Sequence, residues 1–269
     1  MKVDTNISAR TLRVAVRDLE LEVGCWSPAG TPAGADLVLL HEGLGSLSLW
    51  RDFPEQLAAA TDRRVWAWSR QGYGASGHDP VPRTPDYLEI EARDWLPATL
   101  VALRIERPVL VGHSDGGSIA LLHGLLFPGA QAGVIAIAPH SWVEEESLAG
   151  IRIAGQSWRD SLGKAGGFQA RLARHHGDAD RVFSDWHDTW LSPPFRHWDI
   201  RSRLHTIACP TLAVQGRQDE YATLGQIEVV RDSVPGAEMA VIEDCGHSPH
   251  REQPAALIAI LRTFLAGKP

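Results

Sequence analysis

Short apolar runs without polar alternation recur along the chain and limit the folds that it can adopt. Strands that are covered on both faces, as in a parallel sheet, have this pattern. The stretches between the runs have helical apolar periodicity, and the repetition predicts an α/β fold: a mostly parallel central sheet flanked by helices. The apolar runs are Leu37–Leu40, Val65–Trp68, Val109–Val111, Val134–Ile137, Thr211–Val214 and Met239–Ile242, and the helical stretches are Leu47–Ala60, Asp86–Arg104, Gly117–Phe127, Tyr221–Ser233 and Pro254–Leu265.

Two segments depart from this repetition. Near the N-terminus, residues 11–18 and 19–26 alternate apolar and polar side chains, which predicts two half-buried antiparallel strands. From Ser141 to His205 the chain has helical stretches but no apolar strand, and this part holds Trp142, Trp158, Trp186, Trp190 and Trp198. Because so long a bare loop is uncommon in a compact domain, we expect a small helical cap at 141–205, inserted in a core domain of residues 1–140 and 206–269.

The composition argues against a nucleic-acid or membrane partner. The formal net charge is −7 and no basic cluster is present, which does not suit nucleic-acid binding. No apolar run reaches the roughly 18 residues of a membrane span, and the stretch MKVDTNISARTLRV lacks the apolar core of a signal peptide. Three scattered cysteines suit neither a disulfide framework nor a zinc site. We therefore expect a cytoplasmic protein without a metal, nucleotide or flavin cofactor. The sequence does not determine its oligomeric state.

One serine lies where a buried strand is expected to meet a helix. The segment Gly112-His-Ser-Asp-Gly116 is the only G-x-S-x-G of the chain, and small residues continue after it. Between a strand and a helix this pattern is that of a nucleophile elbow, in which a strained serine requires small neighbours two positions away. The helix N-terminus also favours developing negative charge nearby. The pattern predicts that Ser114 is a nucleophile.

A serine hydroxyl becomes a good nucleophile only with a histidine base and an acid that orients this histidine. After an elbow of this kind the acid follows the serine in the chain and the histidine comes last. His247 lies in a loop after the apolar run Met239–Ile242, at the sheet edge where Ser114 is expected. Asp219 lies in the loop after Thr211–Val214, with Glu220 as its neighbouring alternative.

With these residues on this order of elements, the chain resembles the α/β-hydrolase superfamily from about Thr11 onward. The resemblance implies the α/β-hydrolase fold and a catalytic triad of Ser114, Asp219 and His247. It also implies an oxyanion hole, in which the backbone N–H of Asp115 supplies one donor. The Asp115 carboxylate is expected only to favour the helix N-terminus.

The second oxyanion donor is expected in the loop Leu40-His-Glu-Gly-Leu-Gly-Ser46. Members of the superfamily usually carry His-Gly and then a donor residue, whereas Glu42 follows His41 here. Either Gly43 or Leu44 supplies the N–H, and the sequence leaves the choice open. Because a bare carboxylate beside an oxyanion would oppose catalysis, we expect Glu42 to turn away and pair with Arg70.

Other histidines and tryptophans near these segments have less specific patterns. His41 and His113 are expected to be structural and to bond backbone groups. The His175-His176 pair, with Asp178 and Asp180 nearby, resembles a metal cluster only superficially and is expected to be a solvated part of the cap. An apolar substrate pocket is expected to use three tryptophans, namely Trp50, Trp142 and Trp158.

The implied activity is acyl transfer to water. The simplest partner is a small-molecule substrate, namely a small or medium carboxylic ester. A serine at the nucleophile position argues against the dehalogenases and epoxide hydrolases of this superfamily, which have an aspartate there. The same triad also cleaves thioesters, lactones, amides or a carbon–carbon bond. A ligand receptor built on a hydrolase scaffold is the alternative outside enzymes, because this fold hosts many functions.

Overall fold

A computed structural model describes residues 7–78, 80–266 and 268. One sheet of eight strands forms its centre, in the order β1-β2-β4-β3-β5-β6-β7-β8. The first two strands pair in antiparallel fashion, β2 pairs antiparallel with β4, and all later pairs are parallel. The strands are β1 (Ile7–Val16), β2 (Leu19–Pro28), β3 (Leu37–Leu40), β4 (Val65–Trp68), β5 (Val109–His113), β6 (Gly133–Ile137), β7 (Thr211–Gly216) and β8 (Glu238–Ile242).

The predicted strands agree with this sheet, with one difference in burial. Strands β3 to β7 are buried along their whole length, as unbroken apolar runs predict. Strand β8 lies at the edge of the sheet and is partly exposed, so it is not covered on both faces as expected. The β1–β2 hairpin confirms the two antiparallel strands predicted near the N-terminus.

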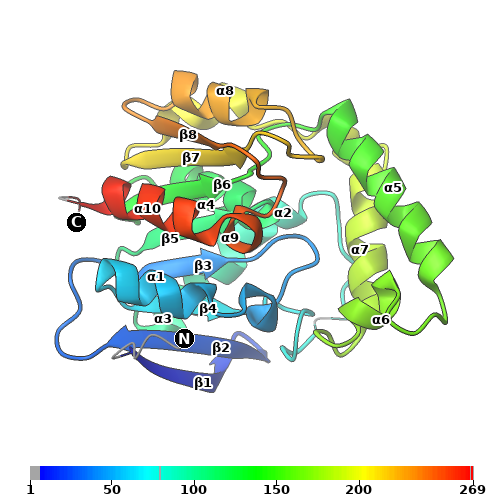
Figure 1. The fold of residues 1–269 in the computed structure, drawn as a ribbon, viewed down its shortest axis with the longest axis horizontal. Helices are drawn as coiled ribbons and strands as arrows, with labels where there is room; N and C mark the ends of the chain where they lie inside the picture. Colours follow the sequence, from blue (N-terminus) through cyan, green and yellow to red (C-terminus); the bar gives the residue numbers. More distant parts are fainter. Residues whose placement is uncertain (1–6, 79, 267, 269) are drawn as a thin grey trace.

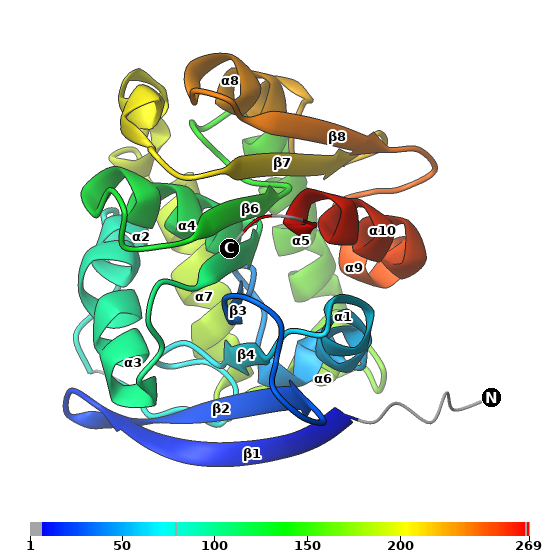
Figure 2. The ribbon, with the colours of Figure 1, turned by 90° about the vertical axis from the view of Figure 1, so that its left-hand side faces the viewer.

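Helices cover both faces of the sheet (Figure 2). On one face lie α2 (Tyr87–Ile90), α3 (Leu96–Leu103) and α4 (Asp115–Leu126), and on the other lie α1 (Phe53–Thr61) and α10 (Pro254–Leu265). Each face has its own apolar core, with Leu110 and Leu121 in the first and Val111 and Leu257 in the second. Alternate residues of β5 therefore serve opposite layers, as strand geometry requires.

Three of the predicted helices differ in detail. The stretch 47–60 is divided into a 3-10 turn η1 (Leu47–Trp50) and α1, because Arg51 between them has φ 52°. The stretch 86–104 contains a π-helical turn, η2 (Glu91–Trp95), just before Pro97, whose missing N–H interrupts the α-helical ladder. The helix α8 (Gly225–Ser233) begins four residues later than predicted.

Most of residues 141–205 form helices that stand beside one end of the sheet (Figure 1), whereas the last turn, 201–206, packs on α4 and α8. Their bounds are α5 (Glu145–Ser161), α6 (Phe168–Leu172), α7 (Ala179–Leu191), η3 (Phe195–His197) and η4 (Arg201–Thr206). A further short helix, α9 (Pro249–Glu252), belongs to the core. A bridge between Trp142 and Asp199 joins the two ends of this segment. Its treatment as a separate cap domain stays a prediction. None of the described helices is both long enough and apolar enough to cross a membrane.

Candidate active site

Ser114 lies in a sharp turn between the end of β5 and the start of α4. Its backbone has φ 52° and ψ −118°, a region that non-glycine residues seldom adopt. Its own N–H donates to the carbonyl of Ile137 at 2.8 Å, which fixes the turn to the neighbouring strand β6. The strained serine that the sequence pattern predicts is therefore present.

Gly112 and Gly116, two positions on either side of Ser114, are required by close backbone approach. A Cβ atom on Gly112 would lie 1.9 Å from the carbonyl oxygen of Gly116. One on Gly116 would lie 2.0 Å from the carbonyl oxygen of Leu40. Both distances are far below van der Waals contact, so no side chain fits at either position without a backbone shift.

His247 lies in the loop between β8 and α9, and its ring is held by Asp219. The His247 Nδ1–H faces both carboxylate oxygens of Asp219, at 2.9 and 3.0 Å. Glu220 makes a different contact, because its Oε2 accepts the backbone N–H of His247 at 3.1 Å. The structure therefore separates the two candidate acids: Asp219 orients the ring, and Glu220 supports the loop.

The charges of this pair reinforce one another. Burial by itself would lower the pKa of His247, but the adjacent Asp219 carboxylate raises it above its ordinary value. Burial would likewise raise the pKa of Asp219, but His247 and the Tyr221 backbone N–H lower it. Asp219 is thus an anion at neutral pH and stabilises a proton on the imidazole.

Glu42 contacts a histidine rather than Arg70, so the expected Glu42–Arg70 ion pair is wrong. Its Oε2 lies 3.4 Å from Nδ1 of His113, and its carboxylate lines the same cavity as Ser114. Arg70 instead donates to the backbone carbonyl of Glu42 at 3.1 Å. Burial opposes ionisation of Glu42, but the hydrogen bond and charge of His113 lower its pKa strongly.

His113 also supports the loop that carries His247. Its Nε2–H donates to the backbone carbonyl of His247 at 2.8 Å, and its ring is buried. His41 has a comparable structural position, because its Nε2 accepts the N–H of Arg70 at 3.0 Å. The prediction that these two histidines bond backbone groups is confirmed.

Arg70 forms its ion pair with Asp115, directly after the serine. The Arg70 Nη2 atom lies 3.7 Å from Asp115 Oδ2, and both side chains are almost wholly buried. The Tyr87 hydroxyl donates to the same Oδ2 at 2.7 Å. The Asp115 carboxylate therefore does more than favour the helix N-terminus, because it neutralises a buried guanidinium beneath the serine turn.

Gly43 and Leu44 occupy the middle of a tight turn and line the same cavity as Ser114. The N–H of Gly45 donates to the carbonyl of Glu42 at 3.0 Å and closes this turn. Within the described residues, neither Gly43 nor Leu44 donates its N–H to a protein acceptor, and both line the cavity. The structure keeps both as candidate donors.

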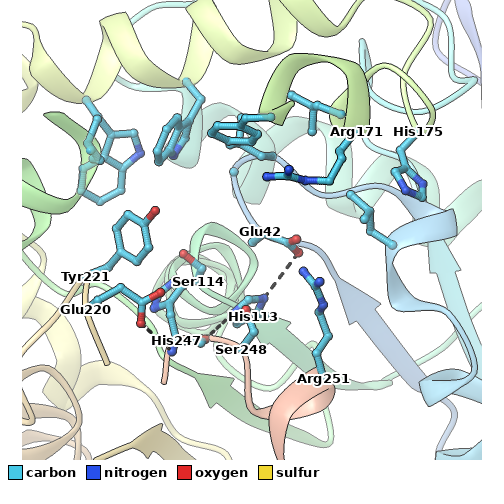
Figure 3. A pocket seen from close by; sticks show the side chains of 18 of the residues that line it. Glu42, His113, Ser114, Arg171, His175, Glu220, Tyr221, His247, Ser248 and Arg251 are labelled. Carbon is cyan, nitrogen blue, oxygen red and sulfur yellow. Dashed lines mark hydrogen bonds and ion pairs between the residues drawn. The ribbon is translucent and has the colours of Figure 1, made fainter. Parts of the chain in front are cut away.

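A cavity of about 390 Å³ brings these groups together (Figure 3). Ser114, His247 and Glu220 lie toward one end of it, and Arg171, His175 and Arg251 lie toward the other. Much of its wall is apolar and comes from the helices of 141–205. These apolar lining residues include Ile151, Phe168, Leu172, Trp186 and Trp190, together with Leu49 of η1.

The three tryptophans expected in the pocket lie elsewhere, so that prediction is wrong. Trp50 is buried in the core, stacked on Phe53 at 5.8 Å between ring centroids. Trp158 stacks on Phe183 at 4.1 Å and holds α5 against α7. Trp142 packs under the Arg201 guanidinium at 4.6 Å.

Trp186 and Trp190 of α7 line the cavity in their place. Both belong to the group of five tryptophans at 141–205, but only the packing of α7 separates them from Trp158. The Trp190 Nε1–H donates to the Tyr87 hydroxyl at 2.9 Å, which ties α7 to the network under Ser114. A cavity residue that sequence reasoning missed is His140, whose pKa burial lowers to about 3, so that it is neutral.

His175 and His176 do not form the solvated surface that their polar neighbourhood suggests. His176 is buried, its Nε2–H donates to the Leu44 carbonyl at 3.0 Å, and its Nδ1 accepts the Gly74 N–H at 3.0 Å. His175 lines the cavity and bonds the Ser48 hydroxyl at 2.8 Å. Among the residues that the structure describes, no group of three or more potential ligands has metal-site geometry.

Solved structures with the same fold cover nearly the whole chain. A proline iminopeptidase from Mycobacterium smegmatis is 21% identical with a TM-score of 0.75, and the match covers 96% of this chain and 98% of that one. The enol-lactonase from Burkholderia xenovorans LB400 is 19% identical with a TM-score of 0.72, covering 95% and 100%.

Curated relatives vary in how much of their length is matched. The rat protein 1-acylglycerol-3-phosphate O-acyltransferase ABHD5 is 31% identical, but the match covers only 48% of this chain and 36% of that protein. A 2-hydroxy-6-oxononadienedioate/2-hydroxy-6-oxononatrienedioate hydrolase from Cupriavidus pinatubonensis is 26% identical over 97% of this chain and 96% of its own length. A pimeloyl-[acyl-carrier protein] methyl ester esterase from Aeromonas hydrophila is 25% identical over 86% and 96%.

The sequence profile of the alpha/beta hydrolase family matches residues 37–260. This range contains the serine turn, the loop of Asp219 and the loop of His247, and it spans most of the central sheet. The chain therefore belongs to the alpha/beta hydrolase family.

Proposed function

We propose that the protein is a serine hydrolase that cleaves a small or medium carboxylic ester through an acyl-enzyme intermediate. The observation that supports this most strongly is one shared cavity: Ser114, in its strained turn, and His247, oriented by Asp219, both line it. Strained backbone conformations persist only where the surrounding structure maintains them, and they are concentrated at functional sites. A turn with a merely structural role does not require this combination.

In the proposed mechanism, His247 Nε2 takes the proton of the Ser114 hydroxyl as Oγ attacks the ester carbonyl. The Asp219 carboxylate holds the proton on Nδ1, which leaves Nε2 free to accept, and stabilises the imidazolium that forms. His247 then gives the proton to the departing alcohol. Water enters by the reverse sequence and releases the carboxylic acid.

The negative charge on the attacked carbonyl oxygen needs donors that are already in position. We assign this role to the backbone N–H of Asp115 and to that of Gly43 or Leu44. Removing one such donor typically costs about 3 kcal/mol of transition-state stabilisation. The Ser114 N–H is excluded, because it donates to Ile137.

The cavity wall suits an acyl or aromatic group of modest size. Trp186, Trp190 and Ile151 supply apolar surface, and this wall comes from the segment that we interpret as a cap. Two of the curated relatives that cover most of the chain act, by their names, on a methyl ester and on a dienedioate or trienedioate. The ester is therefore our first proposal, with a carbon–carbon bond, lactone, thioester or amide as alternatives.

A panel of para-nitrophenyl esters of increasing acyl length tests the proposal. The wild-type protein should release nitrophenol with saturation kinetics, and Ser114→Ala should reduce kcat by at least about a thousandfold. An alkyl phosphonate should label Ser114, as located by mass spectrometry of the labelled peptide. Labelling of another residue, or activity that survives Ser114→Ala, would contradict the proposal.

The same assay, extended to thioesters and diketones, separates the alternatives. Turnover of thioesters or of diketones without turnover of oxygen esters would transfer the proposal to those bonds. Tight, saturable ligand binding with negligible turnover on all of them would indicate a receptor on a hydrolase scaffold.

A further inference from the structure

Four arginines surround the end of the cavity away from Ser114. Arg51 follows η1, and Arg251 lies in α9. Arg171 lies in α6, and Arg174 follows this helix. Segments far apart in the sequence therefore bring their guanidinium groups to one place. Arg171 and Arg251 extend toward the cavity from opposite sides (Figure 3). This gathering is unexpected for a chain of net charge −7.

The four guanidinium groups have no acidic partner in the part of the chain that the structure describes. Elsewhere on the surface, arginines commonly pair with a nearby acid, as Arg217 does with Glu243 at 2.7 Å and Arg231 with Asp232 at 2.7 Å. Within the described residues none of the four forms an ion pair. Among the described residues, Arg171 donates only to the Gly166 carbonyl, at 2.8 Å.

The two carboxylates that line the cavity have partners other than these arginines. Glu42 bonds His113, and Glu220 accepts the N–H of His247. His175 lies among the arginines, and its pKa is lowered first by burial and then by the charges of Arg174, Arg51 and Arg251. The rim is thus a region of uncompensated positive charge, which favours an anion.

The backbone of Arg51 is strained in the same way as that of Ser114. Its φ of 52° and ψ of −124° differ little from the φ of 52° and ψ of −118° of Ser114. Such a conformation costs about 1–3 kcal/mol in a non-glycine residue and is typical of functional positions. Both strained residues line the cavity, at its two functional ends.

We infer that this arginine rim, consisting of Arg51, Arg171, Arg174 and Arg251, binds a carboxylate or phosphate group of the substrate at a distance from the bond that is cleaved. This inference rests on the proposed ester hydrolysis and specifies the substrate class: an ester with a second, anionic end. The planar guanidinium fork matches the two oxygens of such a group. Because the arginines come from both α6 and α9, the anion would also join residues 141–205 to the core.

Matched pairs of esters test the inference. One member is a para-nitrophenyl half-ester of adipate or suberate, and the other has the same acyl chain ending in a neutral isopropyl group. The ratio of kcat/KM for the anionic ester to that for the neutral ester should exceed one in the wild type. It should fall with rising ionic strength, because salt screens exposed charges.

The double variant Arg174→Gln/Arg251→Gln should reduce this ratio by about tenfold, chiefly through KM, since charge-assisted hydrogen bonds are lost. Arg262→Gln, an exposed arginine on α10 that does not line the cavity, is the matched control and should keep the wild-type ratio. A wild type that prefers the neutral ester, or a ratio that the double variant does not change, would overturn the inference.

Binding measurements separate this inference from the proposed function. Should the wild type cleave no ester, the proposed function fails, and calorimetric titration with adipate and with glycerol phosphate decides about the rim. Binding that disappears in Arg174→Gln/Arg251→Gln supports the rim, and the probe that binds identifies carboxylate or phosphate. Absence of binding by both probes would overturn it.

Discussion

Replacing Asp219 by asparagine should almost abolish turnover, whereas replacing Glu220 by glutamine should not. Both acids contact His247, but at different atoms: Asp219 faces the ring Nδ1 at 2.9 Å, and Glu220 accepts the backbone N–H at 3.1 Å. An asparagine that keeps its amide nitrogen toward Nδ1 forces the proton to Nε2. The ring is then in the wrong tautomer to accept the proton of Ser114.

The expected magnitude follows from these contacts. Loss of the correct tautomer in a Ser-His-Asp site lowers kcat by about ten-thousandfold, which corresponds to about 5.5 kcal/mol of barrier. In Glu220→Gln the side-chain oxygen can still accept the N–H of His247, so only the charge is lost. We expect a decrease below about tenfold for this variant.

Steady-state kinetics on the best ester, with active sites counted by phosphonate titration, measures both effects. Circular dichroism and thermal melting confirm that each variant is folded, so that a loss of activity reports on the site. A larger loss in Glu220→Gln than in Asp219→Asn would refute the assignment of Asp219 as the orienting acid. Retention of more than a tenth of the activity in Asp219→Asn would do the same.

Two further predictions concern the pH profile and the serine turn. Protonation of His247 should remove its base function, and because Asp219 raises its pKa, the acidic limb of kcat/KM should lie above the ordinary value of 6.5; a limb well below 6.5, measured in constant-ionic-strength buffers, would contradict this sign. Gly116→Ala should destabilise the fold by about 1–3 kcal/mol or more, since its Cβ would meet the Leu40 carbonyl oxygen at 2.0 Å. Gly177→Ala, whose Cβ has only a 3.9 Å contact, is the matched control, and equal melting temperatures for the two variants would be evidence against the clash.

Sequence reasoning located most of the sheet because burial on both faces leaves a local trace. The runs 37–40 and 65–68 coincide with β3 and β4, and the helical stretch 254–265 coincides with α10. Predicted helices differ from the structure where one backbone torsion or a missing backbone N–H changes the hydrogen bonding. Arg51, at φ 52°, divides one predicted helix, and Pro97 changes the hydrogen bonding of another.

Within the candidate site, the residues that were found are those with a fixed relation to the ends of strands. Ser114 follows β5 directly, and Asp219 and His247 lie a few residues beyond β7 and β8. Glu42 and Trp158 were placed wrongly, because their partners come from other segments. The Glu42 carboxylate contacts His113, whereas Arg70 bonds the backbone carbonyl of Glu42. The Trp158 ring stacks on Phe183 between α5 and α7 rather than lining the cavity.

The sequence by itself determined the alternation of strand and helix, the glycine spacing of the serine turn and the chain order of Ser114, Asp219 and His247. The first two depend on the periodicity of burial and on local sterics, which neighbouring residues determine, and the third follows the chain order usual after a nucleophile elbow. Tertiary structure alone decided which acid faces His247, which tryptophans line the cavity and that four arginines gather at its rim. Such contacts join separate segments, 28 residues apart for Asp219 and His247 and more than a hundred residues apart for Arg51 and Arg171, and no local pattern specifies them.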